Sequence, residues 1–182
     1  MSVRSLMAQD RNLILTGYLE PNRPRLGRQV AQKLGLRFVD IEEMMEDRLG
    51  DSLENARAQY GERHIKTMED QIVRDAALYR HALIRVNGST LVRCEDAARL
   101  MATGVTICLV ARLDAVLQRM HLMMGARFHD PSGREAEIGV LRREWAVRKL
   151  PNILEYDATA KDEPTIVAEL VALWQSIAIQ RG

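Results

Sequence analysis

The sequence is poor in features that mark several large classes of protein. It has only two cysteines, Cys94 and Cys108, which are too few for a disulfide framework. Cys108 lies within an apolar run, so we expect buried or idle thiols in a reducing compartment. No apolar run approaches the ~20 residues that a membrane span needs, and residues 1–11 lack the apolar segment of a signal peptide. These absences predict a soluble, cytoplasmic protein without a membrane partner.

Charge of one sign is also lacking. The formal net charge is +1 and the pI is about 7.8, so no global field attracts nucleic acid, and the sequence holds no basic run. The chain of 182 residues is 47% hydrophobic and 28% charged, which is enough to build a real core. Repeats, low-complexity tracts and linkers are absent as well. We therefore expect a single domain over residues 1–182.

The most informative segment is a loop at residues 17–25, between a strand-like and a helix-like run. A phosphate-binding P-loop reads GxxxxGK[ST] in this setting. Its backbone amides wrap the phosphates, its lysine reaches the terminal phosphates, and its hydroxyl holds Mg²⁺. Gly17 holds the first glycine position. Asn22, Arg23 and Pro24 take the positions of the second glycine, the lysine and the hydroxyl.

These replacements affect phosphate and metal binding by the loop more than its position between a strand and a helix. Arg23 keeps the positive charge of the lysine, but its forked guanidinium is bulkier and directs its donors differently. Pro24 removes both the hydroxyl and a backbone N–H, although proline is tolerated in the first turn of a helix. Glu20 adds a carboxylate to a loop built for anions, and Arg25 partly offsets it. We expect the helix to survive while the metal ligand is lost.

Five short β-like runs alternate with segments of helical periodicity. The runs are Asn12–Thr16, Arg37–Asp40, Ala82–Val86, Val105–Val110 and Ile153–Tyr156. This alternation predicts a five-stranded parallel sheet with helices on both faces, a three-layer α/β/α domain. A first helix is expected at Leu26–Leu34. The last is expected at Thr165–Ile179, with one apolar packing face formed by Ile166, Leu170, Leu173, Trp174 and Ile177.

Two connections are long enough to carry a function. The segment from about 41 to 81 contains at least two helical stretches, broken near Gly50 and Gly61, and we expect it to form a substrate-binding insertion. The stretch at about 125–134 is rich in glycine, proline and charge, and it includes Arg127. Mobile lids over nucleotide sites have this composition.

Taken in order along the chain, these segments resemble the shikimate kinases, P-loop phosphotransferases of the nucleoside-monophosphate-kinase type. The resemblance extends from Leu13 to about Trp174. Family members carry a strand ending in TG, an LGRxLAxxLG-like helix, an FxDxD motif, a GExxFRxxE segment and a glycine triplet. The matching segments here are residues 13–17, 26–36, 38–42, 61–69 and 87–89. Their order and spacing carry the resemblance, because no single short motif is decisive.

The resemblance implies a P-loop kinase fold, ATP and Mg²⁺ as cofactors, and a shikimate-like substrate. It assigns catalysis to Asp40, Glu42, Arg23 and Arg127, with Asp40 also in the metal environment. It assigns phosphate binding to Gly17, Asn22, Arg23, Arg25 and Arg119. It assigns substrate binding to Glu42, Lys66, Gly88 and an arginine before the last strand. Arg148 is named for this role, but Arg142 and Arg143 stay candidates because the spacing to Asp157 does not select one.

The acceptor side also departs from the family pattern. Glu42 replaces an aspartate, and its extra methylene displaces the carboxylate by more than ~1 Å, enough to disturb an in-line transfer. Lys66 replaces an arginine, so bidentate capture of a carboxylate becomes a single ammonium contact. Of the glycine triplet only Gly88 remains, between Asn87 and Ser89.

Three hypotheses follow. The first is a pseudoenzyme that keeps the fold and binds a small anionic ligand, a shikimate-like molecule or a protein partner. The second is a divergent ATP-dependent kinase in which Arg23, Arg25, Arg119 and Arg127 hold phosphates while Asp40 and Glu42 hold the metal. The third is a structural subunit in which the methionine-rich stretch 120–124 is a contact surface. Because several groups that position or stabilise charge are replaced together, the first is preferred.

Overall fold

The computed structural model of the chain describes residues 11–17, 23–125 and 130–180. Five parallel strands form one sheet in the order β2-β3-β1-β4-β5. The strands are β1 (Asn12–Gly17), β2 (Arg37–Asp40), β3 (Ala82–Arg85), β4 (Gly104–Val110) and β5 (Ile153–Asp157). The predicted five strands are confirmed, with ends that differ by one residue at most.

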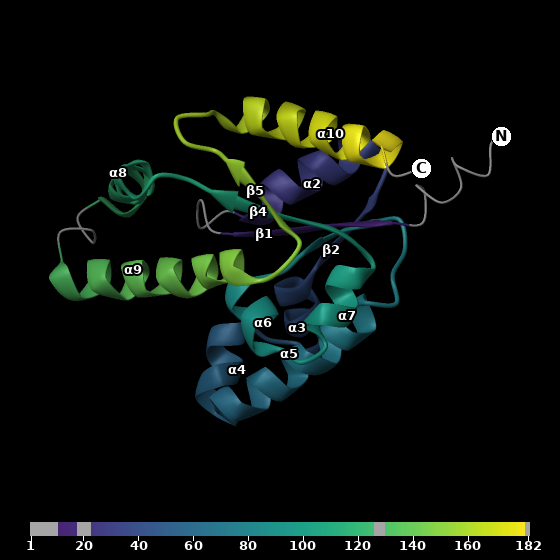
Figure 1. Ribbon diagram of the computed structural model, residues 1–182. Coiled ribbons are helices and arrows are strands. Elements are labelled where there is room, and N and C mark those ends of the chain that lie inside the picture. Colours follow the sequence, from purple (N-terminus) through teal and green to yellow (C-terminus); the bar gives the residue numbers. More distant parts are fainter. Residues whose placement is uncertain (1–10, 18–22, 126–129, 181–182) are drawn as a thin grey trace.

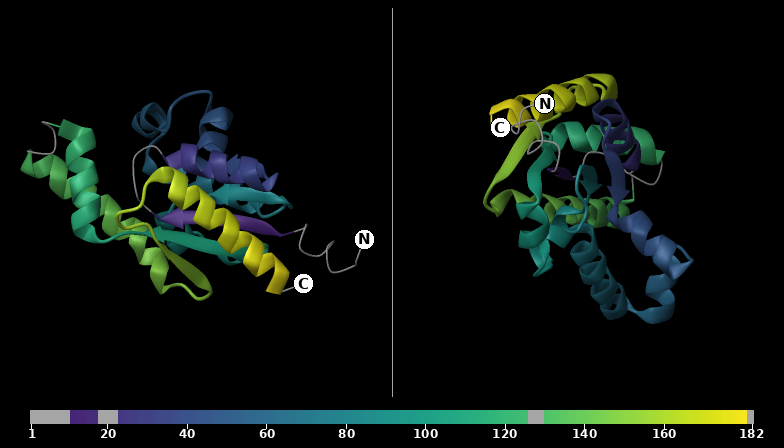
Figure 2. Two further views of the ribbon diagram at one scale, coloured as in Figure 1. Left: turned by 90° about the horizontal axis from the view of Figure 1, so that it is seen from above. Right: turned by 90° about the vertical axis from the view of Figure 1, so that its right-hand side faces the viewer.

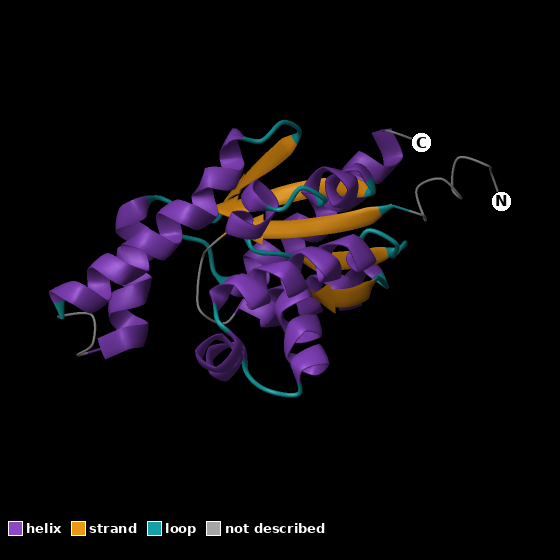
Figure 3. Cartoon of the chain, turned by 90° about the horizontal axis from the view of Figure 1, so that it is seen from below, coloured by secondary structure: helices purple, strands orange, loops and turns teal. Residues whose placement is uncertain are grey.

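Helices cover the sheet on both faces (Figure 1). One face carries α2 (Arg23–Leu34) and α10 (Glu163–Gln180), which lie across the sheet in Figure 2. The other face, nearest the viewer in Figure 3, carries α3 (Ile41–Leu49), α5 (Glu62–Ala76), α6 (Gly88–Arg93) and α7 (Ala97–Ala102). The remaining helices are α4 (Leu53–Tyr60), α8 (Leu113–Met124), α9 (Pro131–Trp145) and the 3₁₀ turn η2 (Ala146–Lys149).

Alternating side chains of the strands build two separate cores. Leu13 and Leu15 of β1 pack toward α2 and α10, whereas Ile14 packs toward α3 and α5. Strands buried on both faces read as continuous apolar runs, which explains the pattern of β1, β3 and β4. The structure therefore has the predicted three-layer α/β/α arrangement, the P-loop kinase fold with a five-stranded parallel sheet.

Gly17 ends β1 at a point where only glycine fits. Its φ is 96°, and a Cβ there would lie 2.2 Å from the carbonyl oxygen of Leu109 in β4. Because β1 and β4 approach closely at this point, the sheet itself requires the glycine. A role for Gly17 at a phosphate is an additional proposal, since residues 18–22 lie outside the described ranges.

Helix boundaries differ from expectation at two loops. Helix α2 begins at Arg23, three residues before the predicted start, so Pro24 lies in its first turn, where an N–H has no helical partner. Helix α9 begins at Pro131, inside the predicted lid-like stretch of about 125–134, because the Asp130 carboxylate accepts hydrogen bonds from the Ser132 and Gly133 amides.

The remaining predictions of local structure are confirmed. The helical breaks at Gly50 and Gly61 separate α3, α4 and α5, which is one helix more than the predicted minimum. The predicted apolar face of the last helix packs into the core. Cys94 and Cys108 are buried free thiols, and Met120 is buried as well. Within the described ranges, no helix combines the length and apolarity needed to cross a bilayer.

Candidate functional site

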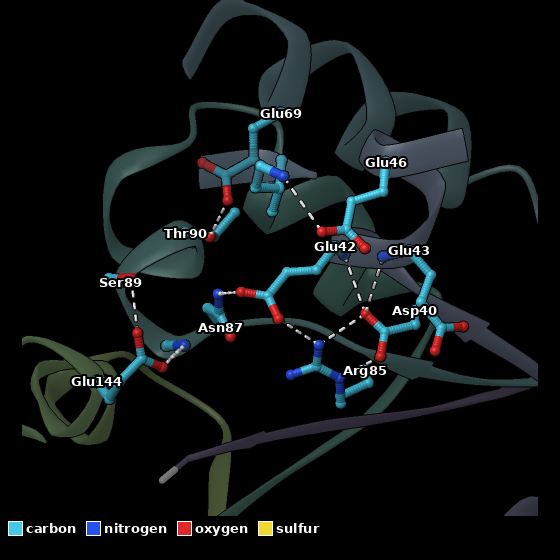
Figure 4. A network of polar contacts seen from close by, with 12 residues as sticks. Asp40, Glu42, Glu43, Glu46, Glu69, Arg85, Asn87, Ser89, Thr90 and Glu144 are labelled. Atoms are coloured by element: carbon cyan, nitrogen blue, oxygen red, sulfur yellow. Dashed lines mark hydrogen bonds and ion pairs between the residues drawn. The ribbon is translucent and has the colours of Figure 1, made fainter. Parts of the chain in front are cut away.

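A buried arginine at the carboxyl end of β3 joins two carboxylates in a network of polar contacts (Figure 4). Arg85 ends β3, and its Cα partner across the sheet is Asp40, the last residue of β2. Arg85 Nε donates to Asp40 Oδ2, and Arg85 Nη2 donates to Asp40 Oδ1 at 2.7 Å. Both side chains are removed from water, with exposed fractions of 6% for Arg85 and 0% for Asp40.

The same guanidinium also holds Glu42. Arg85 Nη2 donates to Glu42 Oε2 at 2.6 Å, and the Asn87 amide donates to Glu42 Oε1 at 2.7 Å. Burial alone would lower the pKa of Arg85, but the hydrogen bonds and negative charges of Asp40 and Glu42 outweigh it, so the pKa is raised. Arg85 is therefore a permanent cation shared by two carboxylates.

Asp40 has a further structural task. Its Oδ1 atom accepts hydrogen bonds from the backbone amides of Glu42 at 3.0 Å and Glu43 at 3.5 Å, which caps α3. The carboxylate thus bonds to the helix through Oδ1 and to Arg85 through both oxygens. This bonding fixes the orientation of Asp40 within the folded protein.

A third carboxylate, that of Glu144, ties α9 to the start of α6. Glu144 accepts a hydrogen bond from the Gly88 amide at 2.6 Å and one from the Ser89 hydroxyl at 2.7 Å. A Cβ on Gly88 would lie 2.1 Å from the Glu144 carbonyl oxygen, so this glycine is needed where the two backbones meet. Gly88 thus has a packing reason within the protein, beside the ligand role that the resemblance assigns.

These groups lie along an open cleft of about 950 Å³. One wall comes from α4 and α5, and the opposite wall from α9 and the residues after it. The charged residues lining the cleft are Arg57, Lys66, Arg85, Arg93 and Arg143, together with Glu42, Glu62, Glu69 and Glu144. Pro24 of α2 also reaches the cleft. The segment from about 41 to 81 therefore supplies one wall of the cleft, and its substrate-binding role stays a prediction.

The structure brings some of the predicted site residues together. Asp40 and Glu42 meet at Arg85, and Lys66 lines the cleft. Gly88 is not in the lining, although its neighbours Asn87 and Ser89 are. Arg25 is engaged elsewhere, because its Nε lies 3.0 Å from Glu163 at the start of α10. Asn22 and Arg127 lie outside the described residues, as do the side chains of Arg23 and Arg119.

Arg148 is not brought to the cleft. Its guanidinium forms two hydrogen bonds of 2.7 Å with the carboxylate of Glu155 on β5, and it is absent from the cleft lining. Arg143 lines the cleft instead, five residues earlier and on α9 rather than on the 3₁₀ turn. Spacing in the sequence could not separate the two, because the direction of each side chain depends on where α9 ends.

The donor set around Asp40 does not fit Mg²⁺. Both Asp40 oxygens accept hydrogen bonds from Arg85, Glu42 Oε2 accepts another from the same guanidinium, and Pro24 offers no hydroxyl. Nor do the described residues contain any cluster of three or more metal-ligating side chains. Mg²⁺ requires several free oxygen ligands in an octahedral arrangement, so the metal role considered for Asp40 has no support from this geometry.

Sequence reasoning missed Arg85, the residue that organises the site. The signal was present, because an arginine in the apolar run Ala82–Val86 needs a buried partner. Finding that partner required the strand order. Only the pairing of β2 with β3 places Asp40 beside Arg85.

The five-stranded parallel sheet, its covering helices and a cleft at the carboxyl ends of the strands define a protein of the P-loop kinase class. The family model described as "Shikimate kinase" matches residues 24–173. The chain belongs to the shikimate kinase family.

Individual relatives agree with this family. The chain is 26% identical over 162 residues to a shikimate kinase of Geobacter metallireducens, covering 88% of this chain and 89% of the relative. A match to a shikimate kinase of Thermodesulfovibrio yellowstonii is 27% identical over 110 residues and spans 64% of that relative.

Solved structures show the same fold at low sequence identity. The shikimate kinase of Acinetobacter baumannii, solved in complex with shikimate, superposes with a TM-score of 0.76 at 16% identity, over 95% of this chain and 97% of the other. The shikimate kinase of Bacteroides thetaiotaomicron gives a TM-score of 0.72 at 20% identity, over 91% and 98%.

Proposed function

We propose that this chain is a shikimate-kinase family member that does not transfer phosphate and that keeps its cleft as a binding site for a small anionic, shikimate-like ligand. A binding or regulatory role would replace catalysis. The observation that carries this proposal is the buried guanidinium of Arg85, which holds both Asp40 and Glu42.

Phosphoryl transfer depends on positioning and on charge stabilisation. A carboxylate that activates an acceptor hydroxyl must be oriented toward that hydroxyl, and hydrogen bonds that hold it toward other groups oppose this. Here the two oxygens of Glu42 already accept from Arg85 and Asn87, at 2.6 and 2.7 Å. Losing one electrostatic group of a catalytic site costs roughly 10²–10³ in rate. Several such losses together would leave transfer negligible.

The P-loop substitutions support the same conclusion. Asn22, Arg23 and Pro24 replace the glycine, lysine and hydroxyl of the motif. Pro24 at the second position of α2 contributes neither an N–H nor a hydroxyl. We infer that this is a degenerate Walker A loop and that ATP and Mg²⁺ are not used. Arg25, the remaining described cation of the loop, is paired with Glu163.

Positively charged residues in the lining of the cleft favour an anionic ligand. Arg57 and Lys66 share one carboxylate, that of Glu62, at 3.4 and 3.9 Å. Arg143 lines the opposite wall and, among the described residues, forms no ion pair. Lys66 and Arg143 both line the cleft, and we propose them as the cations that meet a ligand carboxylate. Of the three candidate arginines before the last strand, we propose Arg143 for the substrate carboxylate, because it lines the cleft and Arg148 does not.

Calorimetric titration tests this function. Shikimate should bind the purified protein without nucleotide. Adding ATP with Mg²⁺ should leave the affinity for shikimate unchanged and should yield no phosphorylated product. Tight magnesium-dependent ATP binding with product formation would instead establish the alternative, a divergent shikimate kinase. Absence of shikimate binding would remove the ligand part of the proposal. Co-purification with an enzyme of aromatic biosynthesis would support a regulatory role.

A further inference from the structure

The geometry around Arg85 points to a metal-binding role that its side chain suppresses. We propose that Asp40 and Glu42 form a latent divalent-cation site and that the Arg85 guanidinium is a resident counter-cation in place of the metal. This inference deepens the proposed function, because it names the reason why the cleft works without Mg²⁺.

Two carboxylate oxygens converge on a single atom. Arg85 Nη2 lies 2.7 Å from Asp40 Oδ1 and 2.6 Å from Glu42 Oε2, so one positive centre bridges two side chains that enter from β2 and α3 (Figure 4). Oxygen ligands bind divalent cations at metal–oxygen distances of about 2.0–2.6 Å. Mg²⁺ is commonly bound through one or two carboxylates, with water completing its coordination shell. A cation in place of Nη2 would need only a small inward shift of both oxygens.

The burial of Asp40 explains why its carboxylate needs a cation beside it. The Asp40 side chain is fully buried, and an uncompensated carboxylate in that position is strongly unfavourable. Its α3 amide partners are held by the backbone, so the oxygen that would face a metal is oriented before any metal arrives. Glu42 is 38% exposed toward the cleft, which gives an ion a path from solvent.

Arg85 therefore neutralises the carboxylates of Asp40 and Glu42 with a cation that is part of the chain and cannot dissociate. A guanidinium keeps its proton at all ordinary pH values, and burial beside two carboxylates raises the pKa of Arg85 further. A metal ion could exchange with solvent and bridge to a phosphate, whereas a side chain on a central strand cannot.

Removing Arg85 should uncover the site. In Arg85→Ser the guanidinium is replaced by a small group that leaves room for a hydrated ion. We expect the variant to bind one Mn²⁺ per chain by electron paramagnetic resonance. Its Tm should rise by roughly 3–6 °C in 10 mM MgCl₂ relative to EDTA, if the dissociation constant is near 1 mM. The unmodified protein should show neither effect.

The matched control is Asp40→Asn/Arg85→Ser, which keeps the space and removes one ligand charge. It should bind no Mn²⁺. A folded Arg85→Ser variant that binds no Mn²⁺, or equal Mn²⁺ binding by the unmodified protein, would overturn the inference. If Arg85→Ser does not fold with or without metal, Arg85→Gln decides, because it keeps more volume and removes the charge: Mn²⁺ binding supports the inference, and its absence overturns it.

The outcome is separable from that of the proposed function. Metal binding is measured on the variants by spin resonance and thermal unfolding, without any assay of transfer. If the variants bind no metal while the unmodified protein still transfers no phosphate, only this inference fails. Phosphorylation of shikimate by the unmodified protein would instead refute the proposed function.

Discussion

Arg85 and Asp40 are direct neighbours across two parallel strands, and the register of the sheet fixes their ion pair. The pair is buried, with Nη2 of Arg85 2.7 Å from Oδ1 of Asp40. Burying two charges is costly, and such a pair is weak support for overall stability. Breaking it from one side, however, leaves the other charge without compensation. We therefore expect replacing Arg85 alone to destabilise the protein more than replacing Arg85 and Asp40 together.

Arg85→Ala should destabilise the protein by about 3–5 kcal/mol in metal-free buffer, because Asp40 keeps a buried charge without its partner. The double variant Asp40→Asn/Arg85→Ala should recover part of that loss, and urea unfolding of both variants would show it. Arg48→Ala is the matched control, because Arg48 pairs with Asp75 at 2.9 Å on the surface. That change should cost about 1 kcal/mol or less. Equal losses for the buried and surface arginines would contradict the prediction.

Gly17→Ala should destabilise the apo protein even though no nucleotide is present. A Cβ would overlap the Leu109 carbonyl and would require a positive φ, so we expect a loss of about 2–4 kcal/mol. Gly35→Ala is the control: Gly35 has a φ of 66° but no atom within 4 Å of the added Cβ, so only about 1 kcal/mol is expected. If thermal unfolding of the two variants is alike, the close approach to β4 is not what requires glycine.

Much of the fold was readable from the sequence because its signals are local. Apolar runs such as Val105–Val110 predict buried strands, and glycines at 50 and 61 predict helix breaks. The site was readable only where the family resemblance supplied it, as for Asp40 and Glu42. The partnership with Arg85 depends on strand order, which local periodicity does not encode. The choice between Arg143 and Arg148 depends on side-chain direction at the end of α9.

Arg143→Ala should weaken shikimate binding to the cleft by roughly ten- to a hundredfold, the effect of losing one charged hydrogen-bond donor. Arg148→Ala should leave the affinity unchanged, because Arg148 faces Glu155 outside the cleft lining. Both arginines are exposed and both substitutions remove one positive charge. The comparison therefore distinguishes a direct contact with shikimate from the long-range effect of the protein's charge on binding. Calorimetric titration measures both. Equal weakening by the two substitutions would point to the long-range effect.

The buried thiols should make stability fall at alkaline pH. Burial raises the pKa of Cys94 to about 11, and burial with the charge of Glu155 raises that of Cys108 to about 12, against an ordinary value of 9.0. The folded state therefore keeps protons that the unfolded state loses above pH 9. Stability from each thiol is complete below pH 9 and is lost toward pH 11–12, at up to about 1.4 kcal/mol per pH unit.

Urea unfolding between pH 8 and 10.5 measures that loss, and Cys94→Ala/Cys108→Ala is the control because tyrosines and lysines also titrate in this range. The double variant should show a flatter decline. The same burial predicts that neither thiol of the native protein reacts with Ellman's reagent at pH 8, whereas two react in denaturant. Rapid labelling of the native protein, or identical pH profiles, would contradict this assignment.

Restoring the P-loop should recover nucleotide binding but not metal-dependent chemistry. The triple variant Asn22→Gly, Arg23→Lys, Pro24→Ser regains a backbone amide, a compact cation and a hydroxyl, all of which favour phosphate. Arg85 would still occupy the carboxylates of Asp40 and Glu42. The restored hydroxyl can contact Mg²⁺, but the carboxylates stay paired, so ATP affinity, titrated in Mg²⁺ and in EDTA, should depend only weakly on Mg²⁺. Adding Arg85→Ser to the triple variant should strengthen that dependence, because it frees the carboxylates of Asp40 and Glu42. Magnesium-dependent phosphorylation of shikimate by the triple variant alone would place the whole defect in the loop and none of it at Arg85.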